Sequence, residues 1–143
     1  MVYFTSVDKA QILEIPRIPD ERGNLSFIQN MDQIPFAIKR VYWINNLPGK
    51  DYSHSYASAK QSEAIIALSG SFDVIINDGK NERRFSLNRP DICLFIPEMT
   101  WWSVVNFATN SVAFVVAEKL DCDNEYIEDF NEYKKMKQYA EEV

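Results

Sequence analysis

A single histidine, His54, limits the acid–base chemistry that this chain of 143 residues can perform. It lies two residues before Tyr56, so on a strand both side chains face the same way, as does that of Ser58. An imidazole has an unperturbed pKa of about 6.5 and suits proton transfer near neutral pH, whereas a phenol at about 10 needs a nearby cation to lower its pKa. His54, Tyr56 and Glu63 are therefore the candidate acid–base groups.

The same histidine count excludes any metal site that needs two or three imidazoles. The two cysteines do not supply the missing ligands, because Cys93 lies in an apolar run and Cys122 in an acidic one. Their positions form neither a secreted disulfide scaffold nor a zinc-finger spacing. We therefore predict no metal, no other cofactor, and reduced thiols in a cytoplasm.

The composition predicts one domain over residues 1–143, with ample apolar mass for a core: 46% of the residues are hydrophobic and 13% aromatic. The 15 Lys and Arg residues against 21 Asp and Glu give a net charge of −6, which argues against nucleic acid or an anionic membrane as partner. No run approaches the roughly 20 apolar residues that a membrane span needs, and the N-terminus does not resemble a signal peptide.

The elements that must position these groups are short strands. Each predicted strand is rich in β-branched and aromatic residues and is bounded by Gly, Pro, Asn or Asp. Evenly spaced short strands without helices between them are typical of an antiparallel β-sandwich or barrel. The predicted strands are Asn24–Gln29, Ile38–Ile44, Glu63–Leu68, Ser71–Asn77, Glu82–Leu87, Ile92–Ile96, Trp101–Asn106 and Ser111–Ala117.

The C-terminal segment changes character. After a β-body over about residues 1–120, aromatic residues and a methionine recur every three or four positions among acids and lysines, at Tyr126, Phe130, Tyr133 and Met136. This spacing predicts an amphipathic helix over about residues 123–141, laid on the β-body.

The spacing of chemical groups also fits the cupins, which are jelly rolls of this size. In their first signature stretch, two histidines precede a glutamate, and a glycine follows it. Glu63 and Gly70 stand in that relation, with six residues between them, and Tyr56 and Ser58 occupy the two histidine positions.

The second cupin stretch is matched by Pro97 and Asn106, while Asp91, Met99 and Trp102 stand at its glycine, glycine and histidine positions. A tyrosine, a serine and a tryptophan cannot replace three imidazoles around zinc, iron or manganese. The pattern predicts the cupin architecture without a metal.

The chain resembles the dTDP-4-keto-6-deoxyglucose 3,4-ketoisomerases, also called the WxcM-like cupins, which act in deoxysugar and aminosugar biosynthesis. The resemblance extends from about Asp20 to Lys137, and its most specific block is the sequence IPFAIKRVYWI at 34–44. The matching stretches are Asp20–Leu25, Ile34–Ile44, Leu68–Ser71, Val74–Gly79 and Asp123–Phe130.

The resemblance implies a metal-free double-stranded β-helix, or jelly roll, usually a homodimer that exchanges N-terminal strands. It implies a thymidine-diphosphate hexose bound within the barrel. Tyr42 and Arg40 lie in the matching block, and Arg22 precedes Gly23 as in the family. Tyr42 is therefore a candidate catalytic residue, and Arg22 and Arg40 are candidate substrate-binding residues.

The family's active-site histidines are replaced in this chain by Tyr56 and Ser58, and a later one by Trp102. Moving a carbonyl from C4 to C3 passes through an enediol, so a group must remove the C3 proton and return one to C4. Either a replacement set that includes His54 and Glu63 does this work, or the pocket binds without turnover.

Several of these residues each have two possible roles. His54 is either a displaced acid–base group or an exposed loop histidine. Ser58 and Tyr56 are expected to line the pocket, and Trp102 either stacks on the ligand or fills the space of the missing imidazole. Arginine side chains suit a diphosphate, although only one of two adjacent strand residues, Lys39 and Arg40, can face the pocket.

The sequence leads to one main hypothesis for the function and to two competing ones. The main hypothesis is a nucleotide-sugar 3,4-ketoisomerase-like cupin acting on a dTDP-4-keto-6-deoxyhexose. The first competing hypothesis is a non-catalytic cupin that binds a sugar nucleotide or sugar. The second is a related isomerase or epimerase that uses a Tyr/His dyad.

Overall fold

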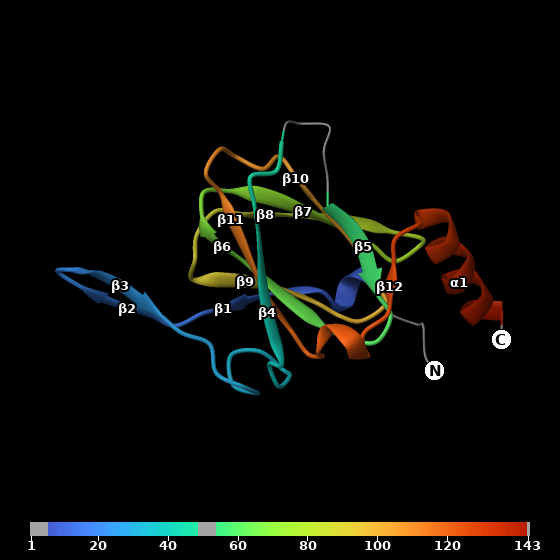
Figure 1. Ribbon diagram of the computed structural model, residues 1–143, viewed down its shortest axis with the longest axis horizontal. Helices are drawn as coiled ribbons and strands as arrows, with labels where there is room; N and C mark the ends of the chain where they lie inside the picture. The colour runs from blue at the N-terminus through green and yellow to red at the C-terminus, as the bar shows by residue number, and fades with distance from the viewer. Residues whose placement is uncertain (1–5, 49–53, 143) are drawn as a thin grey trace.

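The computed structural model describes residues 6–48 and 54–142, and the side chains of all of these except 54 and 140–142. Two five-stranded sheets, antiparallel throughout, form the body (Figure 1). The first sheet has the order β1 (Gln11–Glu14), β9 (Ile92–Ile96), β6 (Glu63–Ser69), β11 (Val112–Ala117) and β4 (Arg40–Asn45). The second has the order β12 (Tyr126–Ile127), β5 (His54–Ser58), β10 (Trp101–Val105), β7 (Phe72–Asn77) and β8 (Glu82–Leu87).

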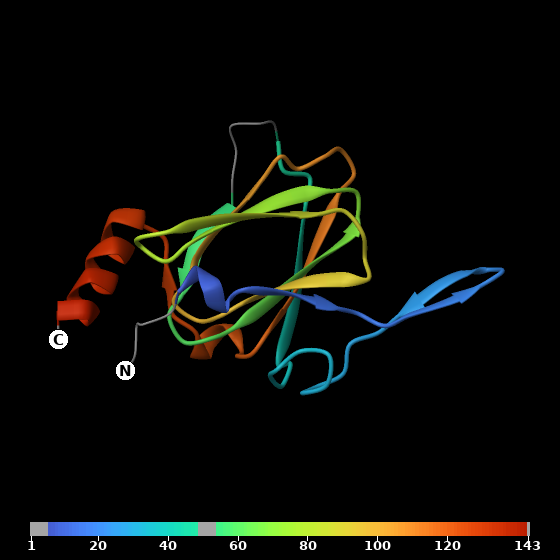
Figure 2. The same ribbon diagram turned by 180° about the vertical axis from the view of Figure 1, so that it is seen from behind.

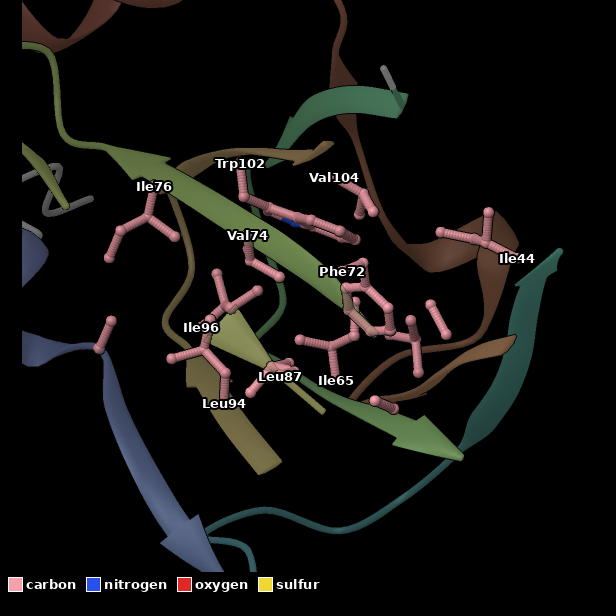
Figure 3. Close-up of a cluster of buried hydrophobic side chains, with 14 of the residues drawn as sticks. Ile44, Ile65, Phe72, Val74, Ile76, Leu87, Leu94, Ile96, Trp102 and Val104 are labelled. Carbon is pink, nitrogen blue, oxygen red and sulfur yellow. The ribbon is translucent and has the colours of Figure 1, made fainter. Parts of the chain in front are cut away.

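The main core lies between these two sheets. In β7 the residues alternate between buried and half-buried, so that Phe72, Val74 and Ile76 point inward. They meet Ile65, Leu94 and other residues of the facing sheet, and Trp102 lies in the same cluster (Figure 3). The structure thus confirms the predicted antiparallel double sheet.

A second cluster covers the outer face of the first sheet. The segment between β3 and β4 places Ile34 and Phe36 against Ala64, Ile66 and Val116, all of them buried. Strand β6 is therefore covered on both faces, and its burial pattern is a continuous run rather than an alternation.

Every strand predicted from the sequence overlaps a strand of the structure, and the described residues form four more. Of these, β1 and β2 (Arg17–Asp20) are largely exposed, so they carry no apolar alternation that could indicate a strand. Strand β2 pairs with β3 (Gly23–Ser26) in a hairpin that projects from the body on the side away from the C-terminal helix (Figures 1 and 2).

The predicted C-terminal helix begins later than the sequence suggested. Helix α1 spans Phe130–Glu142, and the backbone N–H of Asn131 donates to the carboxylate of Asp129 at 2.9 Å. Before it, a short 3₁₀ turn, η2, covers Asp121–Asp123, and Tyr126–Ile127 forms β12 on the edge of β5. The helix prediction was wrong over 123–129 because edge pairing with β5 overrides the helical spacing.

Helix α1 is held to the body by aromatic packing. Tyr133 is fully buried and donates its hydroxyl to the carbonyl of Met99 at 2.7 Å. Trp101 faces outward from β10 and packs on the rings of Phe130 and Tyr133. In the part of the chain that the structure describes, no helix is long and apolar enough to cross a membrane.

Gly70, the glycine of the cupin spacing, is required by a close approach of the chain. Its φ is +72°, and a Cβ there would lie 2.1 Å from Ser111 Oγ and 2.9 Å from Ser111 Cα. We expect Gly70→Ala to lower the free energy of unfolding by roughly 2 kcal/mol or more, since backbone strain and overlap add. Urea unfolding measures it, with Gly79→Ala as control: there φ is +96° but the nearest atom is a lysine Cβ at 3.3 Å. Equal losses in the two variants would contradict the role of the overlap.

Candidate functional site

A carboxylic acid is buried at one end of the space between the sheets. Glu63 is the first residue of β6 and shares its inward face with Ile65 and Ala67. Its neighbours across the sheet are Ala117 on β11 and Ile96 on β9, and only 1% of its surface is exposed. Burial of a carboxylate without donors costs several kcal/mol, so the surrounding groups decide its state.

Three hydroxyl groups reach the Glu63 carboxylate. Tyr42 donates to Oε2, and Tyr56 donates to Oε2 at 2.8 Å. Ser58 donates to Oε1 at 3.0 Å, and the two phenol oxygens lie within hydrogen-bond distance of each other, so two phenol protons are shared among three contacts. We call Tyr42, Tyr56, Ser58 and Glu63 the Glu63 cluster.

Strand alternation brings these side chains together. On β4, Tyr42 points inward between Arg40 and Ile44, and on β5, Tyr56 and Ser58 share one face. Trp102 on β10 lies directly opposite Tyr56 in the register, with ring centroids 5.0 Å apart. Trp102 is 1% exposed and belongs to the core cluster, so it fills the barrel below the Glu63 cluster.

Burial is the largest influence on the protonation of this cluster. It raises the pKa of Glu63, while hydrogen bonds from Tyr42, Tyr56, Ser58 and Trp102 act in the opposite direction. Burial also raises the pKa of both phenols, and the negative charge of Glu63 adds to that effect. The phenols therefore keep their protons and act as donors, and the carboxyl group holds its proton to a higher pH than a solvent-exposed glutamic acid does.

Arg40 forms the rim of the cluster. Its guanidinium donates to the Tyr126 hydroxyl at 2.6 Å and to the Asp121 carboxylate at 3.0 Å, and it lies 4.8 Å from the centre of the Tyr42 ring. The Tyr126 hydroxyl donates to Asp121 at 2.8 Å, and its ring packs edge-on against Tyr56. The segment between β11 and α1 thus closes this end of the barrel.

The structure brings most of the sequence-predicted site residues together, but not all. Tyr42, Tyr56, Ser58, Glu63 and Trp102 are in mutual contact, with Arg40 beside them. Arg22 lies instead in the turn between β2 and β3, where it pairs with Asp20 at 2.9 Å and its side chain is 90% exposed. His54 is the first residue of β5, opposite Val104, and its side chain lies outside the described residues.

Sequence reasoning missed Tyr126, Asp121 and Asn124. The spacing of Tyr126 to Phe130 and Tyr133 is helical, and it therefore predicts the apolar face of a helix rather than a site residue. The contact with Arg40 joins residues 86 positions apart, and only the block at 123–130 indicated this segment.

Comparison with known proteins gives consistent matches. Residues 8–138 match the family model described as FdtA, WxcM-like, C-terminal. The chain is similar to the TDP-4-oxo-6-deoxy-alpha-D-glucose-3,4-oxoisomerase of Aneurinibacillus thermoaerophilus, with 30% identity over 87% of this chain and 90% of the relative.

Solved structures agree with this match. A 3,4-ketoisomerase from Helicobacter canadensis superimposes with a TM-score of 0.85 at 34% identity, over 91% of this chain and 98% of that one. A mutant of the 3,4-ketoisomerase QdtA from Thermoanaerobacterium thermosaccharolyticum, in complex with TDP-4-keto-6-deoxyglucose, gives 0.85 at 27% identity, over 91% and 94%. These neighbours agree with the predicted cupin architecture.

The raised pKa of Glu63 makes a prediction for stability. Between the unfolded value of about 4.5 and the higher folded value, the folded chain binds the proton more tightly than the unfolded chain. The bound proton on Glu63 therefore contributes its full stabilisation of the fold below pH 4.5, and this contribution is lost as the pH rises through the folded pKa of Glu63. We expect Glu63→Gln, which cannot ionise, to gain stability relative to the parent protein as the pH rises towards neutral.

Urea unfolding at several pH values from 4 to 8 measures this difference. Glu98→Gln, at an exposed position of the turn before β10, is the matched control and should follow the parent curve. If the Glu63→Gln curve runs parallel to that of the parent protein, the Glu63 cluster does not hold a proton more tightly than the unfolded chain.

Proposed function

The chain belongs to the FdtA family of WxcM-like proteins, and we propose that it is a nucleotide-sugar 3,4-ketoisomerase acting on a dTDP-4-keto-6-deoxyhexose. The relatives' substrates support this choice, because two of them are named for, or bound to, TDP-4-keto-6-deoxyglucose. The observation that carries the proposal is the Glu63 cluster, a proton acceptor surrounded by donors inside the barrel.

In the proposed reaction, the Glu63 carboxylate removes the proton from C3 of the sugar. The electrons of that bond form the C3–C4 double bond, and the C4 oxygen becomes negative. The phenol of Tyr42, with Tyr56 behind it, donates to this oxygen, as preorganised donors stabilise oxyanions in other enzymes. The proton of the C3 hydroxyl then passes to the C4 oxygen by way of the Tyr42 phenol, and Glu63 returns its proton to C4. The product has its carbonyl at C3 and a hydroxyl at C4, with no net gain or loss of atoms.

The surrounding residues have binding roles in this proposal. Arg40 faces the rim and has the fork of donors that suits the diphosphate. Ser58 holds one oxygen of Glu63, so that the other faces the phenols. Trp102 is buried under the Tyr56 ring, so its role is to fill the barrel below the Glu63 cluster. His54 is a second candidate base, two positions along β5 from Tyr56.

A non-catalytic sugar-nucleotide-binding cupin is the second candidate function. It is favoured by one observation: the positions of the family's paired histidines are occupied by Tyr56 and Ser58, and burial raises the pKa of Tyr56. Such a phenol cannot act as a base near neutral pH. In either case we place the protein in a cytoplasm, where the free thiols of Cys93 and Cys122 stay reduced.

We also propose a homodimer. Outside the second core cluster, the outer face of the first sheet exposes Trp43, Val41 and Leu68, beside an apolar groove of about 380 Å³ that includes Phe27 and Phe114. An apolar patch of this kind marks an interaction surface. The projecting β2–β3 hairpin can carry its tip residue, Arg22, to the barrel of a second copy, which gives that residue a route to the diphosphate.

Deuterium exchange tests the isomerase proposal. Incubation with dTDP-4-keto-6-deoxyglucose in D2O should place deuterium at C3 of the recovered substrate and at C4 of the 3-keto product, detected by mass spectrometry and proton NMR. Glu63→Gln should slow this exchange by about 10²- to 10⁴-fold, the usual contribution of a general base. Glu98→Gln is the control at an exposed position. A loss confined to His54→Ala would assign the base to the imidazole, and no exchange together with thermal stabilisation by dTDP would favour the binding protein.

The dimer is tested by sedimentation equilibrium. The parent protein should sediment at twice the chain mass of 16.6 kDa, whereas Leu68→Glu should sediment at the chain mass because a charge is buried in the apolar patch. Tyr139→Glu, at an exposed aromatic residue of α1, is the control and should remain dimeric. A monomeric parent protein at micromolar concentration would contradict the proposal.

A further inference from the structure

Buried polar atoms without a hydrogen-bond partner gather at one end of the barrel. Within residues 6–48 and 54–142, four such atoms come from the strand ends and turns around Glu63. They are Arg40 Nε, Gln61 Nε2, Thr100 Oγ1 and Asn124 Oδ1. Unpaired polar atoms destabilise a buried site, and a polar ligand that pairs with them removes the deficit.

The topology places all four at the same end. Arg40 begins β4 and Thr100 directly precedes β10. Gln61 lies two residues before β6, and Asn124 follows η2 beyond the end of β11. The opposite end has a hollow of about 560 Å³ around Asn46, where the loops after β4 and β10 meet. None of the four unpaired atoms belongs to a residue that lines that hollow. The missing hydrogen bonds of these four atoms are therefore confined to the Glu63 end.

The orientation of the Asn124 amide follows from its neighbour. Ser58 donates its only hydroxyl proton to Glu63 Oε1 at 3.0 Å, so its oxygen can only accept a further hydrogen bond. Asn124 Nδ2 therefore donates to Ser58 Oγ, at 3.3 Å. The carbonyl oxygen Oδ1 is left as a buried acceptor, separated from the Glu63 carboxylate only by Ser58.

The matching donor is Arg40 Nε, whose other nitrogens are engaged by Tyr126 and Asp121. A hydrogen bond from Asn124 also acts on the Tyr126 hydroxyl, where it lowers the pKa against the larger effect of burial. Asn124 and Arg40 thus converge on one phenol, and between them they offer one buried acceptor and one buried donor. A hydroxyl group, which both donates and accepts, satisfies this pair.

We propose that Asn124 is a specificity-determining residue that accepts a hydrogen bond from the C2 hydroxyl of the bound hexose, with Arg40 Nε donating to the same oxygen. This inference rests on the proposed function. A 4-keto-6-deoxyhexose linked through C1 has hydroxyls only at C2 and C3, and the reaction consumes the C3 hydroxyl. The C2 hydroxyl is adjacent to the reacting carbons, and Asn124 is linked to Glu63 through Ser58.

The test compares ligands that cannot react, because they have no carbonyl. Calorimetry measures the affinity for dTDP, dTDP-6-deoxyglucose and its 2-deoxy analogue in the parent protein and in Asn124→Leu. The parent protein should prefer the 2-hydroxyl ligand by about tenfold, the value of one well-made hydrogen bond. Asn124→Leu should abolish this preference and leave the affinity for dTDP unchanged.

Two further variants keep the test sharp. Asn124→Asp retains an acceptor and should restore part of the preference, which a merely structural role would not do. Asn88→Leu, at an exposed position after β8, should behave as the parent protein. Binding with an undiminished preference in Asn124→Leu overturns this inference alone, whereas no binding of dTDP or either sugar by the parent protein overturns the proposed function with it.

Discussion

Burial of the Glu63 carboxyl group determines how the two sheets meet at this end of the barrel. At 1% exposure it has almost no water to hydrate it, so protein donors must replace that water. They come from β4 and β5, which belong to opposite sheets, as Tyr42 and Tyr56. The carboxyl group therefore links the two sheets at this end through hydrogen bonds, which an apolar side chain could not accept.

In this arrangement, the donation and the acceptance of a proton, which a single imidazole can both perform, fall to different side chains. A histidine donates and accepts protons near neutral pH, but a buried phenol only donates, because desolvation keeps it protonated. Glu63 is then the group that can accept a proton. Burial raises the pKa of its carboxyl group as well. Tyr56 and Ser58 at the histidine positions of the family are thus compatible with proton transfer, provided that a carboxylate stands beside them.

The sequence predicted correctly those features that depend on residue spacing within one strand or between neighbouring strands. Alternation along β7 and the spacing from Tyr56 to Glu63 indicated the inward faces correctly, since strand geometry determines both. The contact of Tyr126 with Arg40 depends on an edge strand of two residues, whose pairing competes with a helical spacing that is equally present in the sequence. The position of Arg22 was beyond prediction because a motif match does not determine the direction of a hairpin.

In the proposed function, Arg40 at the rim would change partners when the diphosphate binds. Arg40 is paired with Asp121, whose side chain is 71% exposed, and ion pairs with so exposed a partner contribute little. Exchange of Asp121 for a diphosphate therefore costs little, and a phosphate oxygen accepts the same two-pronged hydrogen bonds. Tyr126 is released by the same exchange, because its hydroxyl pairs with both Arg40 and Asp121. The groups that close the barrel are thus the ones that an anionic ligand would displace first.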